Sequence, residues 1–144
     1  MLDYSASQTI SPDRVTELLR SHGVSLTQQR VEIAQQLFAQ PQHLSAEQIL
    51  TMVNRKHKRV SKATVYNTLA LFVEHGLLRE VIVDPSKIVY DSNLSAHHHF
   101  YNMDTGLLQD IPSEQVTVAN LPTLPEGTVA AGVEVIIRVR SNNK

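Results

Sequence analysis

Apolar residues recur with helical spacing through the first half of the chain. Four apolar stripes can be distinguished, and each follows a Ser or Thr of the kind that caps a helix N-terminus. Ser45 and Gln48 also have the spacing of a capping box, in which each side chain accepts a hydrogen bond from the other residue's backbone N–H. The pattern therefore predicts four helices. Their expected N-caps are Ser11, Thr27, Ser45 and Ser61, and three of their expected ends lie at Gly23, Pro41 and Gly76.

After the fourth helix the pattern changes to an alternation with period two. Residues 78–83 and 87–90 alternate on either side of a short turn, which predicts a β-hairpin. Helices followed by a two-stranded hairpin form the outline of a winged helix-turn-helix domain. We therefore expect residues 1–91 to form a winged-helix DNA-binding domain.

A second unit is expected after residues 92–96, a polar connection suited to a hinge. Residues 100–103 and 107–111 predict two strands paired around a turn. The last predicted strand, within residues 133–140, has the clearest alternation in the chain. Its apolar face is expected to consist of Val133, Val135, Ile137 and Val139.

The rest of the second unit offers little regular structure. Prolines interrupt residues 112–128 and leave room for at most a short helix. About fifty residues bury little apolar surface alone, so pairing with a second copy would supply the missing core. We expect residues 97–144 to form an α/β dimerisation domain, which makes the fold class α+β and the protein a homodimer.

Composition excludes several classes of protein. With 42% apolar and 19% charged residues, the chain can bury a core and does not resemble a disordered tail. No apolar run approaches the ~20 residues of a membrane-spanning helix, and the first residues lack the pattern of a secretion signal. The absence of cysteine excludes disulfides, thiolate zinc sites and iron–sulfur clusters, and it agrees with a cytoplasmic protein. Any bound metal must be held by His, Asp and Glu.

The net charge of −1 conceals an uneven distribution. Residues 55–62 contain five of the 13 Lys and Arg residues and no acidic residue. Such a cluster either is a solvated helix end or attracts the phosphates of a nucleic acid. The fourth helix beside it presents short polar donors and an aromatic ring outside its apolar stripe. Such residues suit phosphates and base edges, but they also occur on ordinary surface helices. They are Lys62, Thr64, Tyr66, Asn67 and Thr68.

The sequence His97-His98-His99 is the sharpest chemical signal in the chain. If this segment is extended, His97 and His99 share a face and His98 points to the opposite face. Two converging imidazoles suit a divalent metal or haem, although a histidine run can also be simply solvated. Asp91 or Asp110 could add a carboxylate that completes a site.

Four motifs together resemble the ferric uptake regulator family in order and in spacing. The resemblance covers roughly residues 12–140, and within the family the chain is most similar to the haem-responsive iron response regulators of alpha-proteobacteria. The family motifs are Thr27-Gln28-Gln29-Arg30, His43-Leu44-Ser45-Ala46-Glu47, Ala63-Thr64-Val65-Tyr66-Asn67-Thr68-Leu69 and the run His97-His98-His99. The similarity to the haem-responsive branch lies in Val65-Tyr66-Asn67-Thr68-Leu69, Tyr90-Asp91-Ser92-Asn93, His97-His98-His99-Phe100-Tyr101, and Leu124-Pro125-Glu126-Gly127 with Val139-Arg140.

The resemblance implies a regulatory metal site that takes its ligands from both halves of the chain. His43, which alone would be a weak candidate, becomes an expected ligand through this match. A divalent metal (Fe, Mn or Zn), haem, or both are the expected cofactors. The implied metal ligands are His43, Asp91, His97 and His99, with Asp110 as an additional carboxylate in peroxide-sensing members, and the implied haem ligands are His97, His98 and His99.

Two departures from the family pattern change these expectations. Asn102 and Thr105 stand where many members have a Cys-x-x-Cys pair that holds a structural zinc, so a zinc of that type is not expected. The iron response regulators lack this pair as well. The Cys-Pro haem motif of some branch members is also absent, so haem would have to be bound by histidines.

The resemblance further implies a homodimer that binds double-stranded DNA at an A/T-rich operator through the helix at residues 61–72. An iron- or haem-responsive transcriptional regulator is the expected function, with haem lowering DNA binding, and a metal-dependent peroxide-sensing repressor is the alternative. A non-haem iron enzyme is less favoured, because the chain is short and has no glycine-rich cofactor loop, so no enzymatic activity is expected. The expected DNA contacts are Arg30, Arg55, Lys56, Lys58, Arg59, Ser61, Lys62, Thr64, Tyr66 and Asn67.

Overall fold

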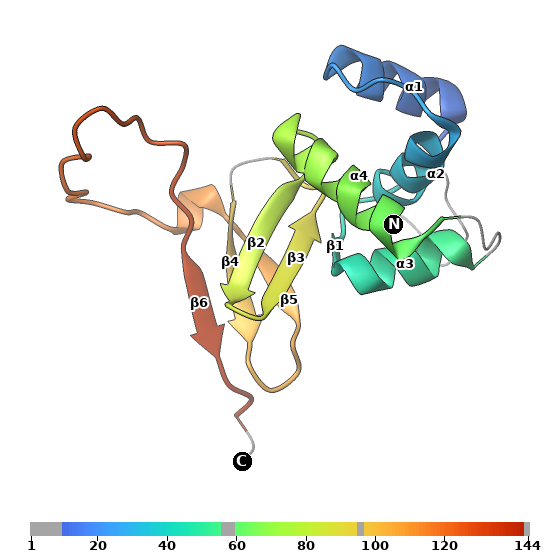
Figure 1. Cartoon of the computed structure of the whole chain (residues 1–144). Helices are drawn as coiled ribbons and strands as arrows, with labels where there is room; N and C mark the ends of the chain where they lie inside the picture. Colours follow the sequence, from blue (N-terminus) through green and yellow to red (C-terminus); the bar gives the residue numbers. More distant parts are fainter. Residues whose placement is uncertain (1–9, 56–59, 95–96, 143–144) are drawn as a thin grey trace. The chain divides into compact units, whose positions relative to one another are not determined.

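The computed structural model describes residues 10–55, 60–94 and 97–142 (Figure 1). The chain divides into two compact units, Met1–Leu94 and Ser95–Lys144. The α-helices of the described residues all belong to the first unit, and each unit has its own three-stranded sheet. Among the described residues, no helix combines the length and the hydropathy that a membrane crossing requires.

The four predicted helices of the first unit are confirmed. They are α1 (Pro12–Ser21), α2 (Gln28–Leu37), α3 (Ala46–Asn54) and α4 (Lys62–Glu74). In each, the hydroxyl of the predicted N-cap accepts a hydrogen bond from the backbone N–H three residues later, which satisfies one donor of the first turn. The capping box of Ser45 and Gln48 is complete, since both reciprocal hydrogen bonds are present. Gly23 and Gly76 follow α1 and α4 with φ of +76°, a conformation that glycine adopts without strain.

A three-stranded antiparallel sheet completes the first unit. Its strands are β1 (His43–Leu44), β2 (Arg79–Asp84) and β3 (Lys87–Asp91), in the order β1-β3-β2. β2 and β3 form the predicted hairpin. β1 cannot be predicted from the pattern, because two residues are too few to show a period. Its pairing with β3 places His43 directly opposite Asp91.

Gln42 fixes the segment between α2 and β1 at both ends. Its side-chain amide donates to the carbonyls of Gln36 and Leu37 at 2.8 and 3.0 Å, which satisfies acceptors at the C-terminus of α2. Its backbone N–H donates to the Ser92 hydroxyl at 3.1 Å, and its carbonyl accepts from the Ser92 N–H at 3.3 Å. α2 therefore ends at Leu37, before the expected end at Pro41, and the chain enters β1 at a fixed position.

One hydrophobic core joins the helices and the sheet of the first unit. The apolar stripes of all four helices meet there. Burial of one large apolar side chain stabilises the fold by ~1.5–3 kcal/mol. Phe38 packs against this core, with its ring centroid 6.0 Å from that of Phe72. The completely or almost completely buried members include Leu19, Ile33, Ile49, Leu69, Phe72 and Leu77.

The second unit is built on a three-stranded sheet with mixed strand directions. Its strands are β4 (His97–Asn102), β5 (Leu108–Pro112) and β6 (Ile136–Val139), in the order β5-β4-β6. β5 is antiparallel and β6 is parallel to β4. β4 begins three residues before the expected strand and so includes the histidine run. The short helix expected among the prolines is a single 3₁₀ turn, η1 (Ser113–Gln115).

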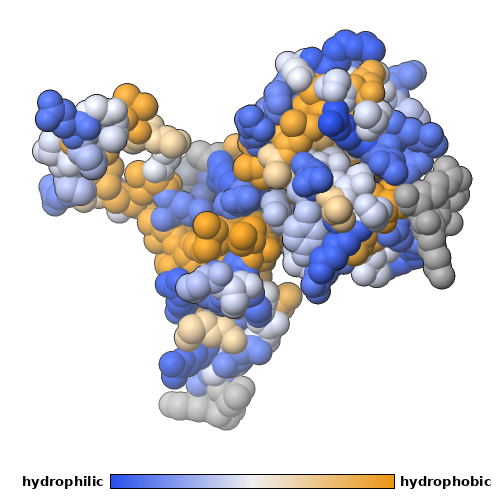
Figure 2. All heavy atoms as spheres, in the orientation of Figure 1, coloured by the Kyte–Doolittle hydropathy of each residue, from blue (hydrophilic) through white to orange (hydrophobic). Residues whose placement is uncertain are grey.

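The last predicted strand is confirmed at Ile136–Val139, as β6, but its expected alternation is wrong. Val133 lies before β6 and Ile137 is 40% exposed, whereas Ile136, expected on the other face, is half-buried. β6 lies at the edge of its sheet, and a unit of about fifty residues has little chain left to cover an edge strand. Apolar side chains also lie on the surface of the long connection between η1 and β6, where Figure 2 shows them among polar ones. They are Val118, Leu121, Leu124 and Val129.

Candidate functional site

In the first unit, His43 and Asp91 form an imidazole–carboxylate pair. The pairing of β1 with β3 sets them opposite each other, with Nε2 of His43 3.2 Å from Oδ2 of Asp91. Asp91 is completely buried, and its Oδ1 atom accepts a hydrogen bond from the backbone N–H of Asn93 at 2.9 Å. Burial of a carboxylate is costly unless donors or a cation satisfy it. The first unit thus brings together two of the expected metal ligands.

In the second unit, three of the expected ligands meet. His97 and His99 have ring centroids 4.5 Å apart, which confirms that the extended histidine run makes these two side chains converge. Asp110 lies opposite His99 on β5, and its Oδ1 atom is 3.4 Å from Nε2 of His97 and 3.3 Å from Nε2 of His99. The ligand atoms of the three residues lie within 4.8 Å of one another. Both histidines are buried.

Glu134, which carries no functional signal in the sequence, completes the surroundings of His99. Its Oε1 atom, just before β6, accepts a hydrogen bond from Nδ1 of His99 at 2.8 Å. Since an ionised carboxylate only accepts hydrogen bonds, Nδ1 carries a proton. A neutral His99 then has its lone pair on Nε2, which faces Asp110. A lone pair and a carboxylate oxygen that face each other favour a cation between them, either a proton or a metal ion.

His98 occupies the intervening position on β4 and makes a different contact. Its Nδ1 atom accepts a hydrogen bond from the backbone N–H of Val135 at 2.9 Å. This contact agrees with the expectation that His98 points away from the other two histidines. It also commits one of the two ring nitrogens to the backbone. The side of β4 shared by His97 and His99 is therefore the one suited to a metal.

The donor chemistry of both clusters fits a divalent metal. Imidazole nitrogens and carboxylate oxygens are ligands for Fe(II), Mn(II) and Zn(II), and the chain has no cysteine thiolate that would favour softer ions. The bond between the Glu134 carboxylate and Nδ1 of His99 is of the kind that commonly supports a metal-bound histidine. Each cluster is therefore suited to contribute ligands to an ion.

α4 presents an exposed polar face that suits a nucleic acid. Lys62, Tyr66 and Asn67 are all exposed. The Lys62 ammonium lies 5.7 Å from the centre of the Tyr66 ring, a cation–π arrangement. The Ser61 hydroxyl donates to the Thr64 hydroxyl at 2.9 Å and accepts from the Thr64 N–H at 3.1 Å, so these groups are held at the start of the helix. All five are among the expected DNA contacts.

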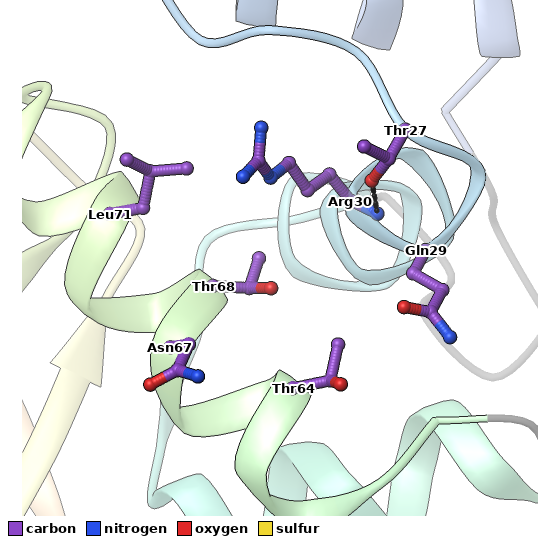
Figure 3. Close-up of a pocket in the computed structure, with 7 residues that line it drawn as sticks. All are labelled: Thr27, Gln29, Arg30, Thr64, Asn67, Thr68 and Leu71. Carbon is purple, nitrogen blue, oxygen red and sulfur yellow. Dashed lines mark hydrogen bonds between the residues drawn. The ribbon is translucent and has the colours of Figure 1, made fainter.

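A cavity of about 320 Å³ lies between the first turn of α2 and α4 (Figure 3). Three expected DNA contacts, Arg30, Thr64 and Asn67, border it. The Arg30 guanidinium donates hydrogen bonds to the carbonyl and the hydroxyl of Ser25 at 2.8 and 2.7 Å, which orient it. The lining residues are Thr27, Gln29, Arg30, Thr64, Asn67, Thr68 and Leu71.

The expectation that Thr68 lies on an outer face of α4 is wrong. Thr68 is only 5% exposed. It follows the buried Val65 by three residues and precedes the buried Phe72 by four, so it lies on the same stripe of the helix. The exposed polar surface of α4 is therefore narrower than the residue types indicate.

The two ends of the basic segment after α3 are joined by Asn54 and Val60. The Asn54 side-chain amide donates to the Val60 carbonyl at 2.8 Å, and its oxygen accepts from the Val60 N–H at 3.2 Å. Arg55, an expected DNA contact, is exposed just after α3. Three more expected contacts, Lys56, Lys58 and Arg59, lie outside the described residues.

Asp84 holds the turn of the hairpin between β2 and β3. Its Oδ1 atom accepts hydrogen bonds from the backbone N–H and the hydroxyl of Ser86, at 2.7 and 2.6 Å. These two bonds, and more weakly the charge of Lys87, lower the pKa of the Asp84 carboxyl. The turn therefore keeps the Asp84 carboxylate charged at neutral pH. Farther along the hairpin, burial and the nearby charge of Glu80 raise the pKa of Tyr90.

Comparison with known proteins identifies relatives along most of the chain. A model of the ferric uptake regulator family matches residues 21–130. The peroxide-responsive repressor PerR of Staphylococcus epidermidis is 31% identical over 98 residues, which are 68% of this chain. The match spans 65% of that repressor, slightly less than two thirds of its length.

Solved structures show the same fold. The ferric uptake regulator from Pseudomonas aeruginosa with manganese superposes with a TM-score of 0.68 and 25% identity, covering 89% of this chain and 98% of that one. The ferric uptake regulator from Francisella tularensis with iron has a TM-score of 0.66 and 20% identity, covering 83% of this chain and 92% of that one, and shows the fold alone.

These similarities confirm the predicted α+β fold class. The relatives carry the names of regulators and of a repressor, which supports the expectation that the chain is not an enzyme. The domain boundaries, the nearer likeness to the haem-responsive branch and the roles of the individual site residues stay predictions.

Proposed function

Because the chain belongs to the ferric uptake regulator family, we propose that it is a metal-responsive transcriptional regulator that binds operator DNA. The observation that carries this proposal is a cluster of imidazole and carboxylate groups in each of the two units. His97, in the second cluster, follows Asp91, in the first, by only six residues. We therefore favour one ion that takes ligands from both clusters over two separate sites.

The proposed regulatory site consists of ligands drawn from both units. A bound divalent cation supplies the positive charge that offsets the burial of the carboxylates. Ligands from both units would restrict the relative orientation of the units, and thereby the spacing of the two α4 helices in a dimer. A spacing of ~34 Å, one turn of DNA, allows both helices to bind at once. The proposed ligands are His43, Asp91, His97, His99 and Asp110.

α4 is the proposed reading helix for the major groove. Tyr66 and Asn67 are exposed and are of types that contact base edges and thymine methyl groups. The cations beside them would bind phosphates, which give affinity and orientation without sequence information. We propose double-stranded, A/T-rich DNA as the partner. The remaining members of the proposed interface are Arg30, Arg55, Lys56, Lys58, Arg59, Ser61, Lys62 and Thr64.

Association of two copies through the second unit is part of the proposal. Its exposed apolar side chains, such as Leu121 at 59% and Val129 at 90% exposed, are the kind of surface that a partner covers. A homodimer also presents two copies of α4 to two half-sites. Such a regulator would act in the cytoplasm, where its operator lies.

Iron, or haem as a report of iron supply, is the proposed signal. In the haem version, the run His97-His98-His99 would bind haem and DNA binding would fall. His98 could offer Nε2 to haem only after its Nδ1 atom releases the Val135 N–H, because that hydrogen bond leaves the ring proton on Nε2. A haem titration followed by DNA-binding measurements tests this version, and unchanged binding by haem-loaded protein would contradict it.

A peroxide-sensing repressor is the second candidate. Two observations favour it: the identity with PerR and the position of the Asp110 carboxylate beside two imidazoles. Oxidation of a ligand histidine would then be the signal. Mass spectrometry of Fe(II)-loaded protein after peroxide separates the candidates, because only this one expects an added oxygen on a peptide with His43, His97 or His99.

Metal-dependent DNA binding is the direct test of the proposed function. A duplex is first selected from a random-sequence library, and its binding by metal-free protein is compared with binding after addition of Fe(II), Mn(II) or Zn(II). Metal is expected to change the affinity in the original protein and not in a variant with His97→Ala and His99→Ala. Glu126→Ala, which removes an exposed charge, is the control. Affinity unaffected by metal, or flat with rising salt, would refute the proposal.

A further inference from the structure

Two consecutive residues before β6 contact two consecutive histidines of β4. Oε1 of Glu134 lies 2.8 Å from Nδ1 of His99. The backbone N–H of Val135 donates to Nδ1 of His98 at 2.9 Å, and its carbonyl accepts from the His99 N–H at 3.1 Å. The parallel pairing of β6 with β4 continues at the next residue, where Ile136 lies opposite His99. The backbone therefore keeps this segment in register with both rings.

The two contacts require opposite protonation of the two Nδ1 atoms. A carboxylate only accepts hydrogen bonds, so Nδ1 of His99 carries a proton. A backbone N–H only donates, so Nδ1 of His98 carries none. A neutral His99 thus has its lone pair on Nε2, whereas a neutral His98 has its proton there. Of these two rings, only that of His99 is prepared to bind a metal through Nε2.

The prepared nitrogen faces the metal-ligand cluster of the second unit. Nε2 of His99 lies 3.3 Å from Oδ1 of Asp110. The His99 side chain is completely buried, whereas that of Glu134 is 30% exposed. Because water does not reach the ring, the bond to Glu134 sets the tautomer and helps to set the ring orientation.

We propose that Glu134 is a positioning residue for metal binding, which holds His99 in the tautomer and orientation that offer Nε2 to a divalent cation. This inference rests on the proposed function, because it takes His99 as a ligand. Loss of such an outer partner typically weakens metal binding by roughly 10–100-fold. Glu134 does not have to touch the ion to have this effect.

Metal affinity in matched variants is the first measurement. Zn(II) and Mn(II) affinities are determined by competition with a chelator for the full chain and for Glu134→Ala, Glu134→Gln and Glu126→Ala. Glu134→Ala is expected to bind about 10–100-fold more weakly. Glu134→Gln is expected to lose less, because its side-chain oxygen still accepts from Nδ1 of His99. Glu126→Ala removes an exposed carboxylate of the same unit and should bind like the original protein.

The second measurement determines the tautomer of His99. If Glu134 only supported the fold, its replacement would leave this tautomer unchanged. Nuclear magnetic resonance of isotope-labelled histidine shows which ring nitrogen carries the proton, in metal-free protein above neutral pH and in Zn(II)-loaded protein. The expected pattern is Nδ1–H for His99 and Nε2–H for His98. Glu134→Ala should mix the two tautomers of His99 and leave His98 unchanged, and Glu134→Gln should restore Nδ1–H.

Three results would overturn the inference. One is an unchanged affinity and tautomer in Glu134→Ala. Another is a smaller number of ions bound per chain in that variant, which would make Glu134 itself a ligand. The third applies if Glu134→Ala does not fold: it is the finding that His99 in Glu134→Gln no longer carries its proton on Nδ1. Metal binding without any change in DNA affinity would instead refute the proposed function, and the tautomer of metal-free protein would still decide the role of Glu134.

Discussion

Asn54→Ala is expected to destabilise the first unit, because one side chain closes the segment that carries the basic cluster. The Asn54 amide donates to the Val60 carbonyl at 2.8 Å and accepts from the Val60 N–H at 3.2 Å. Asn54 is half-buried, so water replaces these partners only in part. Each neutral hydrogen bond contributes ~0.5–1.5 kcal/mol, and the loss of both is expected to lower the free energy of unfolding by about 1–3 kcal/mol.

Urea unfolding followed by far-ultraviolet circular dichroism measures this loss. All α-helices of the described residues belong to the first unit, so the helical signal reports its unfolding. A loss of 1 kcal/mol corresponds to a fall in Tm of about 4–8 °C for a domain of this size. Asn67→Ala is the matched control, because Asn67 is exposed on α4 and its replacement should change stability by no more than ~0.5 kcal/mol.

DNA binding gives the same variant a second readout. Asn54→Ala should weaken binding to a selected duplex, because the bridge to Val60 holds the ends of the segment that begins with Arg55. A urea midpoint equal to that of the original protein would refute the reasoning that these two hydrogen bonds close the segment. A lower midpoint with unchanged DNA affinity would separate the stability of the segment from its proposed contact with phosphates.

Asp84→Asn should remove a pH-dependent part of the stability. The pKa of Asp84 is lowered in the folded state, so its charged form stabilises the fold above the unfolded-state pKa of ~3.9. This stabilisation is lost as the pH falls through the folded-state pKa. Urea midpoints measured across the acid range would show the loss in the original protein and its absence in Asp84→Asn. Joint replacement of His97 and His99 by Ala should abolish the metal response of DNA binding without changing the affinity of metal-free protein, whereas a loss of helical signal would make these residues structural. Asn67→Ala should cost ~1–3 kcal/mol of discrimination at one base pair, while Lys62→Ala should weaken binding to all duplexes and reduce the salt slope by about 1. Equal losses on all sequences for Asn67→Ala would contradict base reading.

The helices and the converging histidines could be predicted because their causes are local. A helix start depends on a cap and on the backbone N–H three residues later, so Ser45 and Gln48 reveal it within four residues. The convergence of His97 and His99 depends only on the two-residue period of a strand. Polar type alone was a poor guide to exposure, since Thr68 lies on the buried stripe of α4.

The strand β1 and the contact between Glu134 and His99 could not be predicted from the sequence, because both depend on pairing between distant segments. β1 has only two residues, and it becomes a strand because β3 offers it a partner. Glu134 lies 35 residues from His99, and only the parallel register of β6 against β4 brings them together. Neither contact leaves a periodic signal in the chain. The predicted last strand is longer than β6 for a related reason, because residues 133–135 alternate in type but lie before the strand.

Because β1 is so short, the number of residues between α2 and His43 decides whether the His43 side chain faces Asp91. Side chains alternate along a strand, so a slip of one residue would turn His43 away from Asp91 while every ligand remained in the sequence. Gln42 prevents such a slip, because it is tied both to the end of α2 and to Ser92. In a homologue, a one-residue insertion or deletion between α2 and this histidine would therefore signal a lost or altered response as clearly as a missing ligand.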